Sequence, residues 1–226
     1  MWCKNCNIET NDEICPICGS KTVEDIPVEV YWCPECKVPI INTTTQADKG
    51  TCPLCGHKTK YMSADLRPVF PEERLLLELL LERKPHEYVQ KSVWAANSSY
   101  YIDGKRVALP AKLFEKADTD ELSKRIEEYK DSNTYEYFDV YAKRFCEANR
   151  NRLNYLVDEA SEFVRNAASK FDEDRLVVSF SGGKDSTVTA DLTINALGTS
   201  SIVHIFGNTT LEFPTTGEYA ERYRHN

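Results

Sequence analysis

Short apolar runs alternate with one amphipathic stretch in the C-terminal part of the chain. Residues 176–180 and 201–206 are rich in β-branched and aromatic side chains and predict strands, whereas residues 185–197 predict a helix that Gly198 closes. This order is a βαβ unit, so we expect a parallel sheet with its ligand crevice at the carboxyl ends of the strands. Residues 218–224 predict the start of another helix. Because two parallel strands bury neither face and leave their edges unpaired, we expect an incomplete domain, either truncated or completed by a second chain.

The middle of the chain predicts a mixed α and β region. Pro71 and two acidic residues precede a leucine-rich stretch, which predicts a buried helix ending near Pro85. Residues 99–108 place Asp-Gly between β-forming residues and predict a hairpin. Another helix is expected to begin near Asp118, and apolar residues at intervals of three and four over residues 138–167 predict one long helix or two abutting helices.

Two features of this region have alternative interpretations. Cys146 lies on the helical pattern, and we expect a small buried hydrophobic residue there and not a nucleophile. The aromatic and basic residues around the hairpin are candidates for an RNA or nucleotide surface, although such residues more often cover a small sheet. They are Lys91, Trp94, Tyr100, Tyr101, Lys105 and Arg106.

Eight of the nine cysteines form four C-x-x-C pairs in the first sixty residues. Two such pairs can surround one ion with four thiolates, which suits zinc, so we expect two structural zinc sites. In sequence order the first four cysteines form one ribbon and the last four the other; iron, redox-active dithiols and crossed pairing remain alternatives. His57, beside the last pair, is expected to face solvent. The predicted ligands are Cys3, Cys6, Cys15, Cys18, Cys33, Cys36, Cys52 and Cys55.

Length and net charge limit the number of domains and the kinds of partner that we expect. The 226 residues correspond to one or two domains, and the net charge of −8 does not favour nucleic acid as a partner, although a local basic patch stays open. The longest apolar stretch, residues 75–81, contains Glu78 and is too short to span a bilayer. We therefore expect no membrane partner and a cytoplasmic protein.

Residues 181–187, Ser-Gly-Gly-Lys-Asp-Ser-Thr, join the first predicted strand to its helix. Glycines let the backbone approach an anion closely, and the N–H groups of the loop and of the helix start point at it. A Walker A loop would need Gly at Val178 and Ser or Thr at Asp185, so a different phosphate-binding loop is predicted. Its charge comes from Lys184, and its hydroxyl donors are Ser181, Ser186 and Thr187.

Two strings of residues resemble a known family. Residues 179–186 resemble the pyrophosphate loop of the adenine nucleotide alpha hydrolase superfamily, also called ATP pyrophosphatases. Residues 206–216 are similar to the segment after the second strand in the phosphoadenosine phosphosulfate reductase family, where an acidic residue, Thr and Gly commonly precede an apolar pair and Phe-Pro. Here Asn208 stands at the acidic position and Thr210 at the Gly.

The resemblance implies an enzyme of sulfur metabolism that binds ATP or a sulfonucleotide (PAPS or APS). The loop of this family holds the β- and γ-phosphates of ATP, with Mg²⁺, while an acceptor oxygen attacks the α-phosphorus and pyrophosphate leaves. The complete loop favours ATP, because sulfonucleotide reductases often carry a degraded version. Catalytic roles fall to Lys184 and Asp185. Implied nucleotide contacts are Ser181, Gly182, Gly183, Lys184, Asp185, Ser186, Thr187, Asn208, Thr209 and Glu212.

Two other functions stay open. The tRNA thiolases also join Cys-rich zinc modules to a Ser-Gly-Gly-Lys-Asp-Ser loop, and would adenylate a tRNA base. A zinc-ribbon adaptor that binds without catalysis is the alternative that is not an enzyme.

In sum we expect an α/β chain with four regions. Two four-cysteine zinc ribbons occupy residues 1–61, and a small α+β domain with a hairpin follows over residues 62–132. A helical connector spans residues 133–174, and residues 175–226 begin a Rossmann-like nucleotide domain with a parallel sheet.

Overall fold

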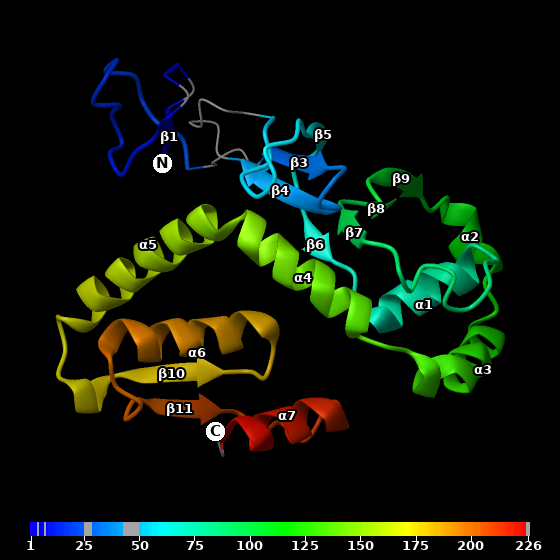
Figure 1. Ribbon diagram of the computed structural model, residues 1–226. Coiled ribbons are helices and arrows are strands. Elements are labelled where there is room, and N and C mark those ends of the chain that lie inside the picture. The colour runs from blue at the N-terminus through cyan, green and yellow to red at the C-terminus, as the bar shows by residue number, and fades with distance from the viewer. Residues whose placement is uncertain (4, 7, 25–28, 43–49, 225–226) are drawn as a thin grey trace. The chain divides into compact units, whose positions relative to one another are not determined.

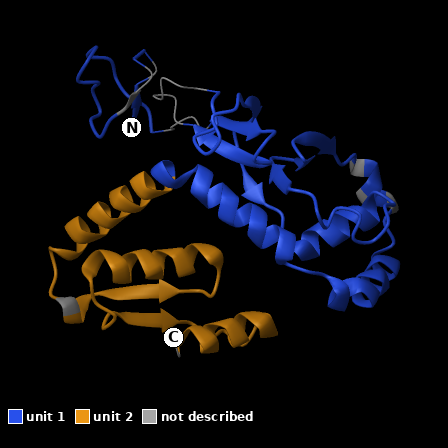
Figure 2. Cartoon of the chain, viewed as in Figure 1, with its two compact units in different colours: residues 1–152 blue, residues 153–226 orange. Residues whose placement is uncertain are grey.

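The computed structural model describes residues 1–3, 5–6, 8–24, 29–42 and 50–224. Contacts divide the chain into two compact units, Met1–Arg152 and Leu153–Asn226 (Figure 2). The mixed helices and strands, with two cysteine clusters near the N-terminus and a parallel strand pair near the C-terminus, confirm the predicted α/β class. The four-region division predicted from the sequence is finer than these two units and stays a prediction. No helix in the described part of the chain is long and apolar enough to cross a membrane.

The first unit begins with two small antiparallel sheets. β1 (Trp2–Cys3) pairs with β2 (Ile8–Glu9), and a second sheet has the strand order β4-β3-β5. The strands of this second sheet are β3 (Glu29–Cys33), β4 (Val38–Asn42) and β5 (Lys60–Ser63). Cys3 is the last residue of β1 and Cys33 the last residue of β3, so in each sheet a strand positions one cysteine of the nearby group.

A four-stranded antiparallel sheet follows, in the order β6-β7-β8-β9. The predicted hairpin is confirmed: β8 and β9 are joined by Asp103 (φ 47°) and Gly104 (φ 77°), the backbone that an Asp-Gly hairpin turn requires. A Cβ on Gly104 would lie 2.4 Å from Nε1 of Trp32, so the turn is pressed against that ring. The strands are β6 (Arg67–Pro68), β7 (Val93–Ala96), β8 (Ser99–Ile102) and β9 (Lys105–Ala108).

The aromatic residues of this sheet lie in a hydrophobic core. Trp94 and Tyr101 are buried together with Val30, Trp32 and Met62, so the core joins the second sheet to the four-stranded one. The Trp94 indole donates to Ser92 Oγ at 2.8 Å, which satisfies its polar atom. Covering the sheet is thus the role of these rings, as the more common interpretation predicted.

Helix α1 (Pro71–Leu80) begins with proline in its first turn and buries Leu75 and Leu77, as predicted. It ends well before Pro85, which corrects the predicted limit. The helix ends in a left-handed turn at Glu82 (φ 54°), where Glu82 N donates to Leu79 O at 3.1 Å and Arg83 N donates to Glu78 O at 2.8 Å. The fully buried carboxylate of Glu78 then accepts backbone N–H bonds from His86 (2.7 Å) and Tyr88 (2.6 Å), which hold the following loop against the helix. Two more helices, α2 (Ala111–Lys116) and α3 (Thr119–Tyr129), follow the sheet, and the side chain of Asp118 caps α3 as predicted.

The long helical pattern forms two helices, α4 (Glu136–Ala148) and α5 (Arg150–Ala168), separated at Asn149. Asn149 is 3% exposed and bonds to strand β4: its Oδ1 accepts from Ile41 N at 2.7 Å, and its Nδ2 donates to Pro39 O at 3.0 Å. The amide side chain therefore occupies the edge of β4 as a neighbouring strand would. Cys146, on the same helix, is exposed, so the prediction of a buried cysteine was wrong.

The second unit contains the predicted βαβ unit (Figure 1). Strand β10 (Val177–Phe180) pairs in parallel with β11 (Val203–Phe206), and helix α6 (Lys184–Leu197) connects them. Gly198 closes α6 with φ 67°, as predicted. Helix α7 (Pro214–Arg224) follows β11. One face of the strand pair packs against both helices through Val178, Phe180, Ala190, Ile202, Tyr219 and Tyr223, whereas Val177, Val203 and Ile205 are exposed.

Candidate functional site

The loop between β10 and α6 has the backbone of an anion-binding turn. Gly182 has φ 74°, a left-handed conformation that favours glycine, and Gly183 is the N-cap of α6. The first helical bond runs from Thr187 N to Gly183 O at 3.1 Å. The N–H groups of residues 184–186 therefore precede the helical hydrogen-bond ladder and are available to an anion at the positive end of the helix dipole.

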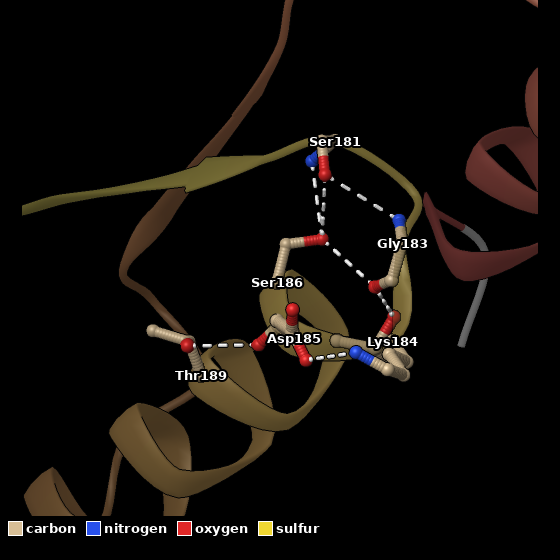
Figure 3. Close-up of polar contacts among 7 residues, drawn as sticks. Ser181, Gly183, Lys184, Asp185, Ser186 and Thr189 are labelled. Atoms are coloured by element: carbon tan, nitrogen blue, oxygen red, sulfur yellow. Dashed lines mark hydrogen bonds and ion pairs between the residues drawn. The ribbon is translucent and has the colours of Figure 1, made fainter. Parts of the chain in front are cut away.

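The hydroxyl groups of the loop are engaged with the loop itself (Figure 3). Ser181 donates its proton to Ser186 Oγ at 3.1 Å, and Ser186 donates to Gly183 O at 3.0 Å. Thr187 donates to the same carbonyl at 2.9 Å. The three residues predicted as hydroxyl donors are thus brought together, but in this arrangement their protons fix the shape of the loop and the backbone N–H groups remain for a ligand.

The two charged residues of the loop are exposed. Lys184 Nζ lies 2.8 Å from Asp185 Oδ1, and each side chain is 88% exposed. An exposed pair of this kind contributes little to stability, from about 0 to 1 kcal/mol, so either partner can turn to another ion at small cost. Asp185 does not cap the helix, because Gly183 occupies the N-cap. Its carboxylate instead lies in the first turn, and its carbonyl accepts from Thr189 Oγ1 at 2.9 Å.

A second polar segment follows β11. Asn208 Oδ1 accepts from Thr210 N at 2.8 Å, and Thr209 Oγ1 donates to Glu212 Oε1 at 2.9 Å. Thr210 has φ 66°, which costs a β-branched residue about 1–2 kcal/mol. A backbone of this kind is where glycine is expected, and Gly is the residue that the resembled family commonly has there. The segment therefore keeps the turn even though Thr replaces the glycine.

The two segments meet at one edge of the strand pair. Phe180 and Phe206, the last residues of β10 and β11, are directly paired, so the loop after each strand starts at the same edge. A cavity of about 690 Å³ lies along β11 and α7. Phe180, Phe206 and Asn208 are among its lining residues, whereas residues 181–187 are not.

The eight predicted metal ligands form two separate groups. Within each group the four sulfur atoms lie within 4.8 Å of one another. The Sγ–Sγ distances include 3.5 Å for Cys3 and Cys18 and 3.8 Å for Cys36 and Cys52. A tetrahedral ion with Zn–S bonds of about 2.3 Å places its sulfurs about 3.8 Å apart, so the donors fit zinc. The grouping follows sequence order and excludes crossed pairing of the cysteine pairs.

Three of the four cysteine pairs are followed by similar turns. The residue after the second cysteine is left-handed at Gly19 (φ 70°), Lys37 (φ 56°) and Gly56 (φ 74°), which explains the two glycines. In the second group, burial is the largest cause that raises the pKa of Cys33 to about 11. A bound cation would offset this cost of forming thiolates. His57 is exposed, as predicted, and is not among the four clustered ligands.

Sequence reasoning missed Tyr219, which contacts the loop at residues 181–187, and Asn149, which bonds to strand β4. Asn149 bonds to a strand that lies 108 residues earlier in the chain. Tyr219 OH lies 3.1 Å from Thr187 Oγ1 in the loop at residues 181–187. Neither residue belongs to a local motif, and no spacing in the sequence indicates its partner.

Part of the chain is similar to known proteins. Residues 175–226 match the family model described as phosphoadenosine phosphosulfate reductase domain. The uncharacterized protein MJ0066 of Methanocaldococcus jannaschii is 36% identical over 90 residues, which are 40% of this chain and 18% of that protein. The chain thus spans less than a fifth of this curated relative. No solved structure gives a significant match. The segment of residues 175–226, with its loop and parallel strands, is therefore similar to the phosphoadenosine phosphosulfate reductase domain.

Proposed function

We propose that residues 181–187 bind the phosphates of an adenine nucleotide. The observation that carries this proposal is the loop itself: three backbone N–H groups at the start of α6 are left for a ligand while the hydroxyl groups hold the loop in shape. Donors that are already oriented lose little entropy on binding and are well suited to stabilise developing charge. The family match of the same residues supports a nucleotide as the ligand.

The proposed reaction is adenylation with ATP as the donor. An acceptor oxygen attacks the α-phosphorus, the bond from that phosphorus to the bridging oxygen breaks, and pyrophosphate leaves with the electron pair. The N–H groups and Lys184 stabilise the charge that collects on the departing pyrophosphate. Mg²⁺ would share that charge, and Asp185, exposed beside Lys184, is the carboxylate placed to hold it. Asn208, Thr209 and Glu212 would contact the rest of the nucleotide from the second segment.

Sulfonucleotide reduction is the second candidate, and the family match favours it. A sulfonucleotide presents a sulfate where ATP presents its β- and γ-phosphates, so the same N–H groups would bind it without releasing pyrophosphate. RNA modification is less well supported. Trp94 and Tyr101 are buried in the core of the first unit and are not available to stack on a base.

We further propose that each four-cysteine group holds a structural zinc ion. Four thiolates close the coordination sphere and leave no position for a substrate. The second group is part of a core with Val38, Ile40 and Ala148, so the ion would also stabilise the contact of α4 with β4. A catalytic role of either metal is therefore not expected.

The test is pyrophosphate release from ATP and Mg²⁺ by the full-length protein. The Lys184→Ala variant should release pyrophosphate about tenfold to hundredfold more slowly, because a hydrogen bond from a charged group contributes about 1.5–3 kcal/mol. Lys170→Ala is the matched control, since it removes the same charge from an exposed lysine that precedes β10, at the end of the strand opposite the loop.

Each outcome selects a function. Release that Lys184→Ala slows at least tenfold and Lys170→Ala preserves supports adenylation, whereas equal release by both variants contradicts the role of Lys184. If no pyrophosphate appears but a sulfonucleotide binds, the chain belongs with the reductases. If neither nucleotide binds, the proposed nucleotide site is wrong and the adaptor remains.

A further inference from the structure

Helix α7 contacts the phosphate loop at two points. Tyr219 OH lies 3.1 Å from Thr187 Oγ1. A Cβ built on Gly182 would lie 3.1 Å from Cγ2 of Thr216 and 3.8 Å from the Tyr219 ring, so the backbone of the loop runs against the first two turns of α7. The helix that follows the second segment therefore also supports the first one.

We infer that the hydroxyl of Tyr219 is a positioning group of the phosphate loop. This inference rests on the proposed function, because it assigns Tyr219 a role in the binding of the nucleotide's phosphates. Tyr219 would not touch the ligand; it would act through Thr187.

The direction of the hydrogen bonds follows from counting protons. Thr187 has one hydroxyl proton, which it donates to Gly183 O at 2.9 Å. In the contact with Tyr219, the tyrosine hydroxyl must then donate and Thr187 Oγ1 must accept. The result is a chain from the Tyr219 hydroxyl through Thr187 to the carbonyl of Gly183.

The carbonyl at the end of this chain explains why the arrangement matters for an anion. Gly183 O accepts three bonds, from Thr187 N, Ser186 Oγ and Thr187 Oγ1. These donors hold the carbonyl toward the helix, so that its partial negative charge does not oppose a phosphate at the adjacent N–H groups. Without the Tyr219 hydroxyl, the hydroxyl group of Thr187 can rotate away from Gly183 O. The peptide bond between Gly183 and Lys184 then loses one of the hydrogen bonds that fix its orientation.

The ring of Tyr219 is itself held in place. It stacks on Phe180 with centroids 6.2 Å apart and an angle of 27°, and Arg222 lies 6.0 Å from its centroid. Its hydroxyl is consequently directed at Thr187 without much loss of side-chain freedom. Tyr223 stacks on the same Phe180 ring at 4.4 Å and belongs to the same helix, which makes it the natural control.

The experiment measures binding of inorganic pyrophosphate to the full chain by calorimetry. Tyr219→Phe keeps the ring and removes the hydroxyl, and it should weaken binding about three- to tenfold, the range expected for one neutral hydrogen bond. Tyr223→Phe should change affinity less than twofold. In a Thr187→Val background, Tyr219→Phe should have no further effect, because the group through which it acts is gone.

Hydrogen exchange of the free protein provides a second readout. In Tyr219→Phe the amide of Thr187, which bonds to Gly183 O, should exchange several-fold faster, whereas amides in the middle of α6 should not change. This measurement tests the hydrogen bond between Tyr219 and Thr187 even in a protein that binds no pyrophosphate, so its outcome is separate from that of the proposed function. Unchanged affinity, an equal effect in the Thr187→Val background, or unchanged exchange at Thr187 would each overturn the inference.

Discussion

The two glycines of the loop at residues 181–187 should respond differently to the same substitution. Gly182 has φ 74°, and a methyl group there would meet Thr216 Cγ2 at 3.1 Å. Gly183 has φ −84° and ψ 166°, an extended conformation that any residue adopts, and a methyl group there would meet only Ser181 Oγ at 3.5 Å, an ordinary contact. Gly182→Ala and Gly183→Ala therefore add the same atom to neighbouring positions with different strain.

The expected free energies of unfolding follow from these geometries. Alanine in a left-handed conformation costs about 1–2 kcal/mol, and the shift of Thr216 adds to that cost. Alanine also restricts the unfolded chain, which stabilises the folded state by about 0.4–1 kcal/mol at either position. Gly183 is also the N-cap of α6, where alanine is less favourable than glycine by about 0.5–1 kcal/mol, and this cost offsets the gain at that position. The net expectation is a loss of about 1–2 kcal/mol for Gly182→Ala and little change for Gly183→Ala, a difference of about 1–2 kcal/mol between the variants.

Thermal unfolding without nucleotide, followed by circular dichroism, measures this difference. For a unit of this size, about 1 kcal/mol corresponds to a shift of about 4–8 °C in Tm. Gly182→Ala should melt lower than the parent protein and Gly183→Ala at about the same temperature. Equal shifts for the two variants, or a stabilising Gly182→Ala, would refute the conformation and the close approach assigned to Gly182.

Three further predictions concern the first unit. Asn149→Ala should lower the free energy of unfolding by about 2–4 kcal/mol, because two backbone groups of β4 lose their hydrogen-bond partner. A urea titration followed by tryptophan fluorescence measures this loss. As the control, Asn151→Ala at an exposed position of the next helix should change the free energy of unfolding by less than about 0.5 kcal/mol. Lys37→Gly should leave Tm unchanged or raise it slightly, because relief of the left-handed strain, about 1–2 kcal/mol, is partly offset by the about 0.4–1 kcal/mol that glycine costs by freeing the unfolded chain; a clearly lower Tm would contradict that strain. The hydrogen bond from Arg67 lowers the pKa of Glu73. The ionised carboxylate therefore stabilises the fold at pH values above its ordinary pKa, and this contribution is lost as the pH falls through the lowered pKa. Between pH 6 and pH 3, Glu73→Gln should consequently lose less free energy of unfolding than the parent protein.

Much of the local structure was predictable because its causes are local. The cysteine spacing, the Asp-Gly hairpin at residues 103–104 and the cap at Asp118 each depend on a few neighbouring residues, and the structure confirms them. The strand, loop and helix around residues 181–187 are also present as predicted. The nucleotide contacts assigned to this loop remain predictions, since they concern a ligand and not the chain alone.

The predictions that failed depended on distant parts of the chain. The end of α1 was placed too late because a left-handed turn at Glu82, which is not glycine, stops the helix, and the buried Glu78 binds the backbone of the loop that follows. Cys146 was expected to be buried because it shares a helix with apolar residues, but periodicity alone does not say which side of a helix finds a partner.

Local sequence specifies which short segments form and which chemistry they carry: thiolates in pairs, a glycine-rich loop at the end of a strand, and a polar turn after the next strand. How these parts meet depends on the packing of the whole chain. This packing grouped the cysteine pairs in sequence order, ended α4 at Asn149 against β4, and placed Tyr219 against Thr187. Turns and helix starts are set by the conformations of adjacent residues, whereas these contacts join residues between 15 and 110 positions apart and exist only once the chain has packed.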